Sequence, residues 1–125
     1  MSVTFWIENT KYQEVWDEEC QCTLSIPVGE NFEINMSNTN FYDFMLALGR
    51  LKEATNYAGK WVPFEQNNIL LRVRKLQGIE GVFEKAIVET GSFTSVGRDA
   101  EYVKLSQFVK LLNEAMSRNE SIIFC

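Results

Sequence analysis

The stretch FEINMSNTNFYDFMLALG, residues Phe32–Gly49, decides the fold because it predicts a strand, a turn and a helix in succession. Residues 32–36 alternate between apolar and polar, which is the period of a strand with one buried face. From about residue 38 to residue 48 the apolar residues instead recur at helical spacing, as a single stripe. The residues of that stripe are Phe41, Phe44, Met45 and Leu48.

Residues at both ends of this predicted helix fit its termini. Ser37 is a plausible N-cap, since a hydroxyl there can accept a hydrogen bond from a backbone N–H of the first turn. Asn40 is the alternative N-cap, because Asp43 follows it by three residues, at the position that the acidic residue of a capping box takes. Gly49 suits the left-handed position that commonly follows a helix.

Three strand-like segments precede this region. Residues 2–8 carry apolar residues on both faces, and residues 12–18 form a possible acidic edge strand. Residues 19–26 alternate most cleanly, which is typical of a half-buried antiparallel strand, and Pro27 ends the run. We expect 19–26 to pair with 32–36 in a hairpin whose loop holds about five residues.

The second half of the chain is mainly helical. A helix is expected to begin at Pro63 and to end at Gly78, and a longer one is expected from a cap at Asp99 to Asn119. Residues 50–61 look polar and irregular, and 79–97 indicate no definite structure. Residues 121–125 predict a final strand that is apolar on both faces, and such a strand belongs inside a sheet.

This order of elements predicts one α+β domain spanning residues 1–125. A small, mainly antiparallel sheet would combine the N-terminal strands with the C-terminal strand. About three α-helices would pack on one face of that sheet.

The chain contains no histidine, so catalytic triads, cysteine–histidine dyads and HExxH zinc sites are excluded. Carboxylates are common in an acidic chain and indicate no particular catalytic pair. We therefore expect a protein that is not an enzyme, with no catalytic residues, no metal site and no cofactor.

Charge is distributed unevenly along the chain. The overall net charge is −5, but residues 1–49 hold eight acids and Lys11 as their single base. Phosphates would be repelled by that half, which disfavours a nucleic acid partner. A basic protein surface fits it better.

Three cysteines make an odd number, which does not indicate a disulfide framework. We interpret Cys20 and Cys22 as small buried side chains and Cys125 as a free terminal thiol. No signal peptide is visible, and no apolar run is long enough to span a membrane. These features together favour a cytoplasmic protein with no membrane partner.

The segment YQEVWDEE, residues 12–19, is the best candidate for a partner-binding surface, because aromatic residues anchor protein interfaces and acids speed encounter with a basic partner. An inhibitor, immunity-type or adaptor role would use such a surface. The alternative interpretation is an edge strand whose acids guard it. The candidate binding residues are Tyr12, Glu14, Trp16, Asp17, Glu18 and Glu19.

A second hypothesis is a small-ligand or nucleotide site at the Asn-rich turn, where a helix N-terminus attracts anions. Capping explains the same composition, because helix starts prefer Asn, Ser and Thr. The candidate ligand-binding residues are Asn35, Ser37, Asn38, Asn40 and Trp61.

Overall fold

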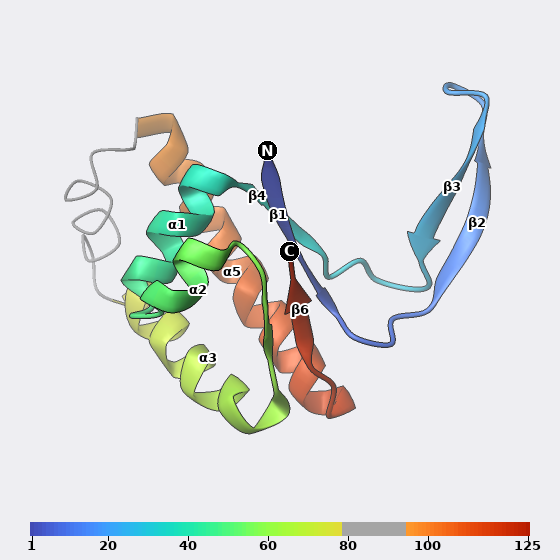
Figure 1. Ribbon diagram of the computed structural model, residues 1–125. Helices are drawn as coiled ribbons and strands as arrows, with labels where there is room; N and C mark the ends of the chain where they lie inside the picture. The colour runs from blue at the N-terminus through green and yellow to red at the C-terminus, as the bar shows by residue number, and fades with distance from the viewer. Residues whose placement is uncertain (79–94) are drawn as a thin grey trace.

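The computed structural model describes residues 1–78 and 95–125 (Figure 1). Four strands come first, a short strand lies between the helices, and the last strand ends the chain. In order, the elements are β1 Ser2–Ile7, β2 Tyr12–Asp17, β3 Cys22–Pro27, β4 Ile34–Ser37, α1 Asn38–Ala47, α2 Leu51–Asn56, β5 Gly59–Trp61, α3 Pro63–Gly78, α5 Ser95–Arg118 and β6 Ile122–Phe124.

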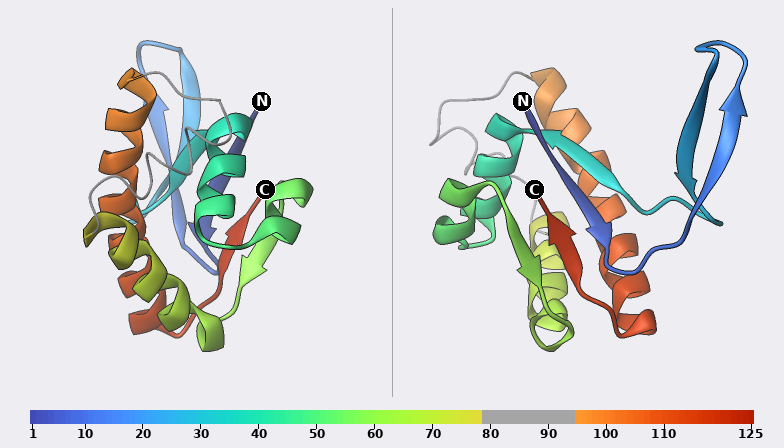
Figure 2. Two further views of the ribbon diagram at one scale, coloured as in Figure 1. Left: turned by 90° about the vertical axis from the view of Figure 1, so that its left-hand side faces the viewer. Right: turned by 45° about the vertical axis from the view of Figure 1, so that its right-hand side comes forward.

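The main sheet has the strand order β4-β1-β6-β5, and all three of its pairings are antiparallel. Helices cover one of its faces (Figure 2), so the α+β class is confirmed. The C-terminal strand β6 lies between β1 and β5, as its apolar residues on both faces predicted.

Period-two alternation places the inward residues of the four strands against the helices. Phe5 stands at the centre of this core, with its ring centroid 4.8 Å from that of Phe108 and 4.9 Å from that of Phe124. Such aromatic pairs add to the free energy gained by burying apolar area. The inward residues of the sheet are Val3, Phe5, Ile7, Ile34, Met36, Trp61, Ile122 and Phe124.

Helix α1 forms where the sequence predicted it. The Ser37 hydroxyl accepts a hydrogen bond from the backbone N–H of Asn40 at 3.1 Å, so Ser37 rather than Asn40 is the cap. Gly49 follows the helix with φ of +75°, a conformation that costs glycine little. The first strand, the helix from Pro63 and the left-handed Asn119 after α5 are likewise confirmed.

The predicted hairpin between residues 19–26 and 32–36 is wrong. β3 pairs instead with β2, and β4 pairs with β1. Two physical reasons account for this difference. Only four residues separate β2 from β3, which makes their closure local, and β4 buries Ile34 and Met36 only by joining the helix-covered sheet.

Three further expectations need correction. Residues 50–61 are not irregular, since they form α2 and β5. Asp99 is not a cap, because α5 begins at Ser95 and Asp99 lies within it. The segment left open as 79–97 falls mostly outside the described residues, and its last three residues belong to α5.

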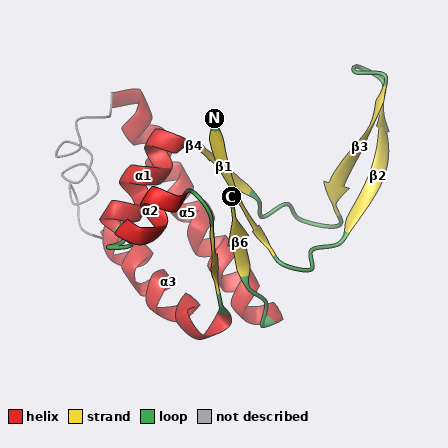
Figure 3. Cartoon of the chain, viewed as in Figure 1, coloured by secondary structure: helices red, strands yellow, loops and turns green. Residues whose placement is uncertain are grey.

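The β2–β3 hairpin stands away from the main sheet and the helices, joined to them by two connections (Figures 1 and 3). Five of the six residues of β2 are exposed, as are the four central residues of β3. Among the described residues, no helix has both the length and the apolar character needed to cross a membrane.

Candidate interaction surface

The hairpin carries large apolar side chains on both of its faces. Directly opposite residues of an antiparallel pair share a face, so Tyr12, Glu14 and Trp16 lie together, opposite Pro27, Ser25 and Thr23. Trp16 is 54% exposed and Tyr12 is 44% exposed, which leaves both rings accessible. The structure therefore gathers the two predicted aromatic anchors on one face of a projecting element.

The opposite face of the hairpin is also apolar, as the alternation of residues 19–26 predicted, but it is exposed. Val15 lies opposite Leu24, and Ile26 lies next to this pair along β3. These three side chains are between 38% and 42% exposed. The alternation of residues 19–26 correctly separated two faces, but the apolar face is not half-buried in a core.

The predicted acids lie at the hairpin tip, where Asp17 ends β2 and Glu18 and Glu19 begin the turn. The Asp17 Oδ1 accepts a hydrogen bond from the backbone N–H of Glu19 at 2.9 Å. The Gln21 Nε2 donates to the carbonyl of Glu18 at 2.8 Å, and Gln21 itself has φ of +53°. These local bonds fix the backbone of the turn that carries Glu18 and Glu19.

Cys20 and Cys22 are joined by a disulfide bond in this turn. The interpretation of both as buried free thiols is therefore wrong. Cys20 is exposed because the turn projects into solvent, and Cys125 is an exposed free thiol at the opposite end of the chain. An odd cysteine count does not exclude one such pair.

The base of the hairpin is tied to the connection that leads into β4. The Tyr12 hydroxyl donates a hydrogen bond of 2.5 Å to Oε1 of Glu33. This bond, partial burial and the negative charge of Glu33 raise the pKa of Tyr12 to about 12. Tyr12 therefore has two roles, as an exposed ring and as a tether.

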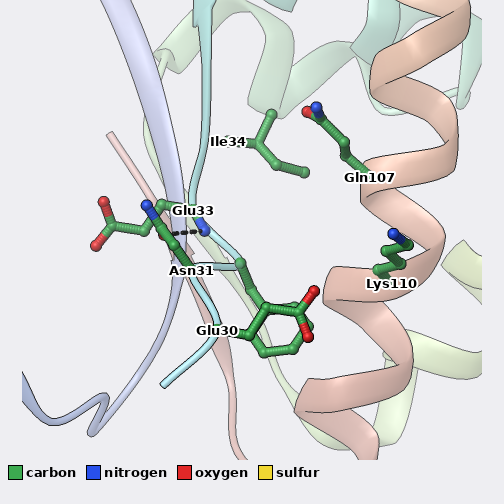
Figure 4. A pocket seen from close by; sticks show the side chains of 7 residues that line it. Glu30, Asn31, Glu33, Ile34, Gln107 and Lys110 are labelled. Carbon is green, nitrogen blue, oxygen red and sulfur yellow. Dashed lines mark hydrogen bonds between the residues drawn. The ribbon is translucent and has the colours of Figure 1, made fainter. Parts of the chain in front are cut away.

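A small hollow of about 220 Å³ lies between this connection and α5 (Figure 4). Gln107 and Lys110 approach it from the helix, whereas the carboxylate of Glu33 points to the other side, where it meets Tyr12. The hollow is smaller than the cavities of about 300–1,000 Å³ that usually hold ligands. Its lining residues are Glu30, Asn31, Phe32, Glu33, Ile34, Gln107 and Lys110.

The residues of the alternative ligand site separate into two groups. Asn35, Ser37, Asn38 and Asn40 meet where β4 leads into α1. The Asn35 Nδ2 donates to Oγ1 of Thr4 at 2.8 Å, and the Ser37 hydroxyl is engaged as the helix cap.

Trp61, the fifth candidate residue, lies in the core, apart from the other four. It is fully buried, and its Nε1 donates to Oε2 of Glu53 at 3.0 Å. Its ring packs against those of Phe5 and Phe124. Trp61 therefore offers no face to a ligand on the surface.

No protein-family model, curated protein or solved structure matches this chain.

Proposed function

We propose that this protein acts by binding another protein, one with a basic surface, through the β2–β3 hairpin. The observation that carries the proposal is the joint exposure of Trp16 and Tyr12 on one face of an element that projects from the main sheet. Tryptophan and tyrosine are enriched among the residues that contribute most to interface affinity. An inhibitor, immunity-type or adaptor role would use such a surface without catalysis.

The hairpin has a physical reason to bind a partner. An isolated two-stranded hairpin is marginally stable in water, and this one leaves apolar side chains exposed on both faces. Covering Trp16 on one face, or Leu24 and Ile26 on the other, removes apolar area from water and so stabilises the complex.

The acids of the hairpin indicate that the partner has a positively charged surface. Glu14 lies between the two aromatic anchors, and Asp17, Glu18 and Glu19 lie at the tip. Negative charge near an interface speeds encounter with a positively charged surface and depends on salt concentration. We expect the chain to do this in the cytoplasm, where glutathione keeps most thiols reduced and the disulfides that do form are usually transient and redox-active.

The proposal is tested by recovering a partner with the full chain and measuring its affinity for variants. Trp16→Ala should weaken binding by about tenfold or more, mainly through faster dissociation. Glu18→Lys combined with Glu19→Lys should slow association and reduce its dependence on salt.

The matched control is Phe64→Ala, because Phe64 is 94% exposed on α3 and far from the hairpin in sequence. It should bind like the unaltered chain. If the partner binds the Trp16 and the charge-reversal variants with unchanged affinity and rates, the hairpin is not the binding surface.

A further inference from the structure

The disulfide at the hairpin tip spans a single residue. Cys20 and Cys22 lie on either side of Gln21, with their Cα atoms 5.3 Å apart. Gln21 has φ of +53°, which turns the chain so that both sulfur atoms lie on the same side. Cys20 is exposed and Cys22 is half-buried.

The fold does not depend on this bond in the way that a small disulfide-rich domain does. A disulfide stabilises a fold mainly by closing a loop in the unfolded chain, and the effect grows with loop length. A disulfide that closes a loop of one residue therefore stabilises the fold least. The hydrogen bonds at Glu19 and Gln21, and the pairing of Asp17 with Cys22, can persist with the bond open.

We propose that Cys20 and Cys22 form a thiol–disulfide exchange site that reacts with low-molecular-weight thiols and disulfides such as glutathione. In oxidation, the thiolate of the exposed Cys20 attacks oxidised glutathione, forms a mixed disulfide and releases one glutathione. The thiolate of Cys22 then attacks the Cys20 sulfur and releases the second glutathione. Two electrons and two protons thereby pass from the two cysteines to glutathione.

Exposure favours this chemistry. Exposed disulfides are in general the labile ones, whereas structural disulfides resist reduction by glutathione. The assignment of Cys20 as the attacking residue follows from its greater accessibility.

The acids of the tip set a charge preference. Asp17, Glu18 and Glu19 lie within three residues of Cys20, so a negatively charged reagent approaches against repulsion. Relative to its rate with an uncharged small-molecule disulfide, which corrects for differences in thiolate fraction, a positively charged thiol such as cysteamine should reduce the bond fastest, neutral mercaptoethanol more slowly and negatively charged glutathione most slowly. Added salt should narrow these differences.

A regulatory consequence rests on the proposed function. Opening the bond removes the covalent constraint on the turn that carries Glu18 and Glu19, so these acids gain freedom of movement even while the hydrogen bonds of the turn remain. We expect the two forms to differ in their affinity for the partner.

The exchange itself is tested on the full chain without a partner, in the Cys125→Ser variant that removes the remaining thiol. The protein is equilibrated in buffers of graded glutathione ratio, its thiols are alkylated, and the mass is measured. The expected result is a reversible transition in which two thiols appear together while the near-ultraviolet circular dichroism of the core stays unchanged. Adding Cys22→Ser should trap a mixed disulfide at Cys20, and the matched Cys20→Ser variant should trap less at Cys22.

Two results would overturn the proposal. One is a bond that glutathione reduces only in denaturant, and the other is a pair of thiols that never oxidise in the folded chain. Neither result bears on whether the hairpin binds a partner, so a failure here is distinct from a failure of the proposed function. Equal partner affinity of the two redox forms would contradict only the regulatory consequence.

Discussion

At the scale of single residues, Tyr12 makes a measurable prediction about pH. Its pKa is raised from the ordinary value of 10 to about 12, mainly by the hydrogen bond to Glu33. The folded chain therefore holds the phenol proton more tightly than the unfolded chain does. The resulting stabilisation is complete below pH 10 and is lost as the pH rises toward 12.

This prediction is checked by titrating the phenolate absorbance of the unaltered chain and of Tyr12→Phe, whose difference isolates Tyr12. Glu33→Gln should bring the pKa of Tyr12 back toward 10 because it removes the acceptor charge. Glu30→Gln is the matched control, on the same connection, and should leave the pKa near 12. If the pKa of Tyr12 stays near 12 in Glu33→Gln, the hydrogen bond to Glu33 does not form in solution.

At the scale of elements, Gln66 links three parts of the fold. It lies fully buried in α3, and its Nε2 donates to the carbonyl of Trp61 at 2.9 Å and to that of Glu120 at 2.8 Å. These carbonyls end β5 and precede β6, so one amide group ties a helix to two neighbouring strands. Replacing Gln66 by methionine keeps the length of the side chain but removes both donors.

Gln66→Met should therefore lower the free energy of unfolding by about 1–3 kcal/mol, the cost of leaving buried acceptors unpaired. Urea unfolding measures this change. Gln107→Met, the same substitution at an exposed position of α5, should change stability by less than about 0.5 kcal/mol. Equal stabilities for the two variants would mean that the buried amide does not support the junction.

Local signals explain which elements the sequence predicts. Ser37 and Gly49 mark the ends of α1 because caps act through the adjacent backbone, and the apolar segment 122–124 indicates a central strand by composition alone. Strand pairing is not local. The pattern of Leu24 and Ile26 shows that β3 has an apolar face, but it carries no information about what covers that face.

The candidate site, like the fold, could be predicted from the sequence only where the signal is local. Aromatic residues among acids marked Tyr12 and Trp16 from composition, whereas their shared exposed face depends on the pairing of β2 with β3. The disulfide could not be read from a cysteine count. It requires the left-handed turn at Gln21, which no residue preference predicts.

At the scale of the whole molecule, the projecting hairpin combines acidic residues with exposed large apolar side chains. The exposed apolar residues of the hairpin are Tyr12, Val15, Trp16, Leu24 and Ile26. Acids lie at the tip of the hairpin, whereas the exposed bases of the α3 helix lie on another part of the molecule. These bases are Arg72, Arg74 and Lys75. The core of the main sheet and helices includes no residue of β2 or β3. We therefore expect the hairpin to be separable from the fold.

One hydrogen bond shows where the hairpin can be removed from the chain. The backbone N–H of Val28 donates to the carbonyl of Lys11 at 2.9 Å, so the two ends of the hairpin already lie side by side. This is the bond that closes a two-residue β-turn, in which Asn-Gly is strongly preferred. Replacing residues 12–27 by Asn-Gly should therefore leave the surrounding backbone in place.

The shortened chain should unfold with a free energy within about 1 kcal/mol of the full chain, since it loses little beyond the hydrogen bond of Tyr12 to Glu33. Urea unfolding followed by tryptophan fluorescence measures this, because Trp6 and the buried Trp61 lie in the main sheet and remain in the shortened chain. Phe5→Ala is the control that shows the assay detects core damage, with an expected loss of about 3–5 kcal/mol. A shortened chain that folds but no longer binds the partner assigns binding to the hairpin, whereas one that does not fold would show that β2 and β3 support the main sheet after all.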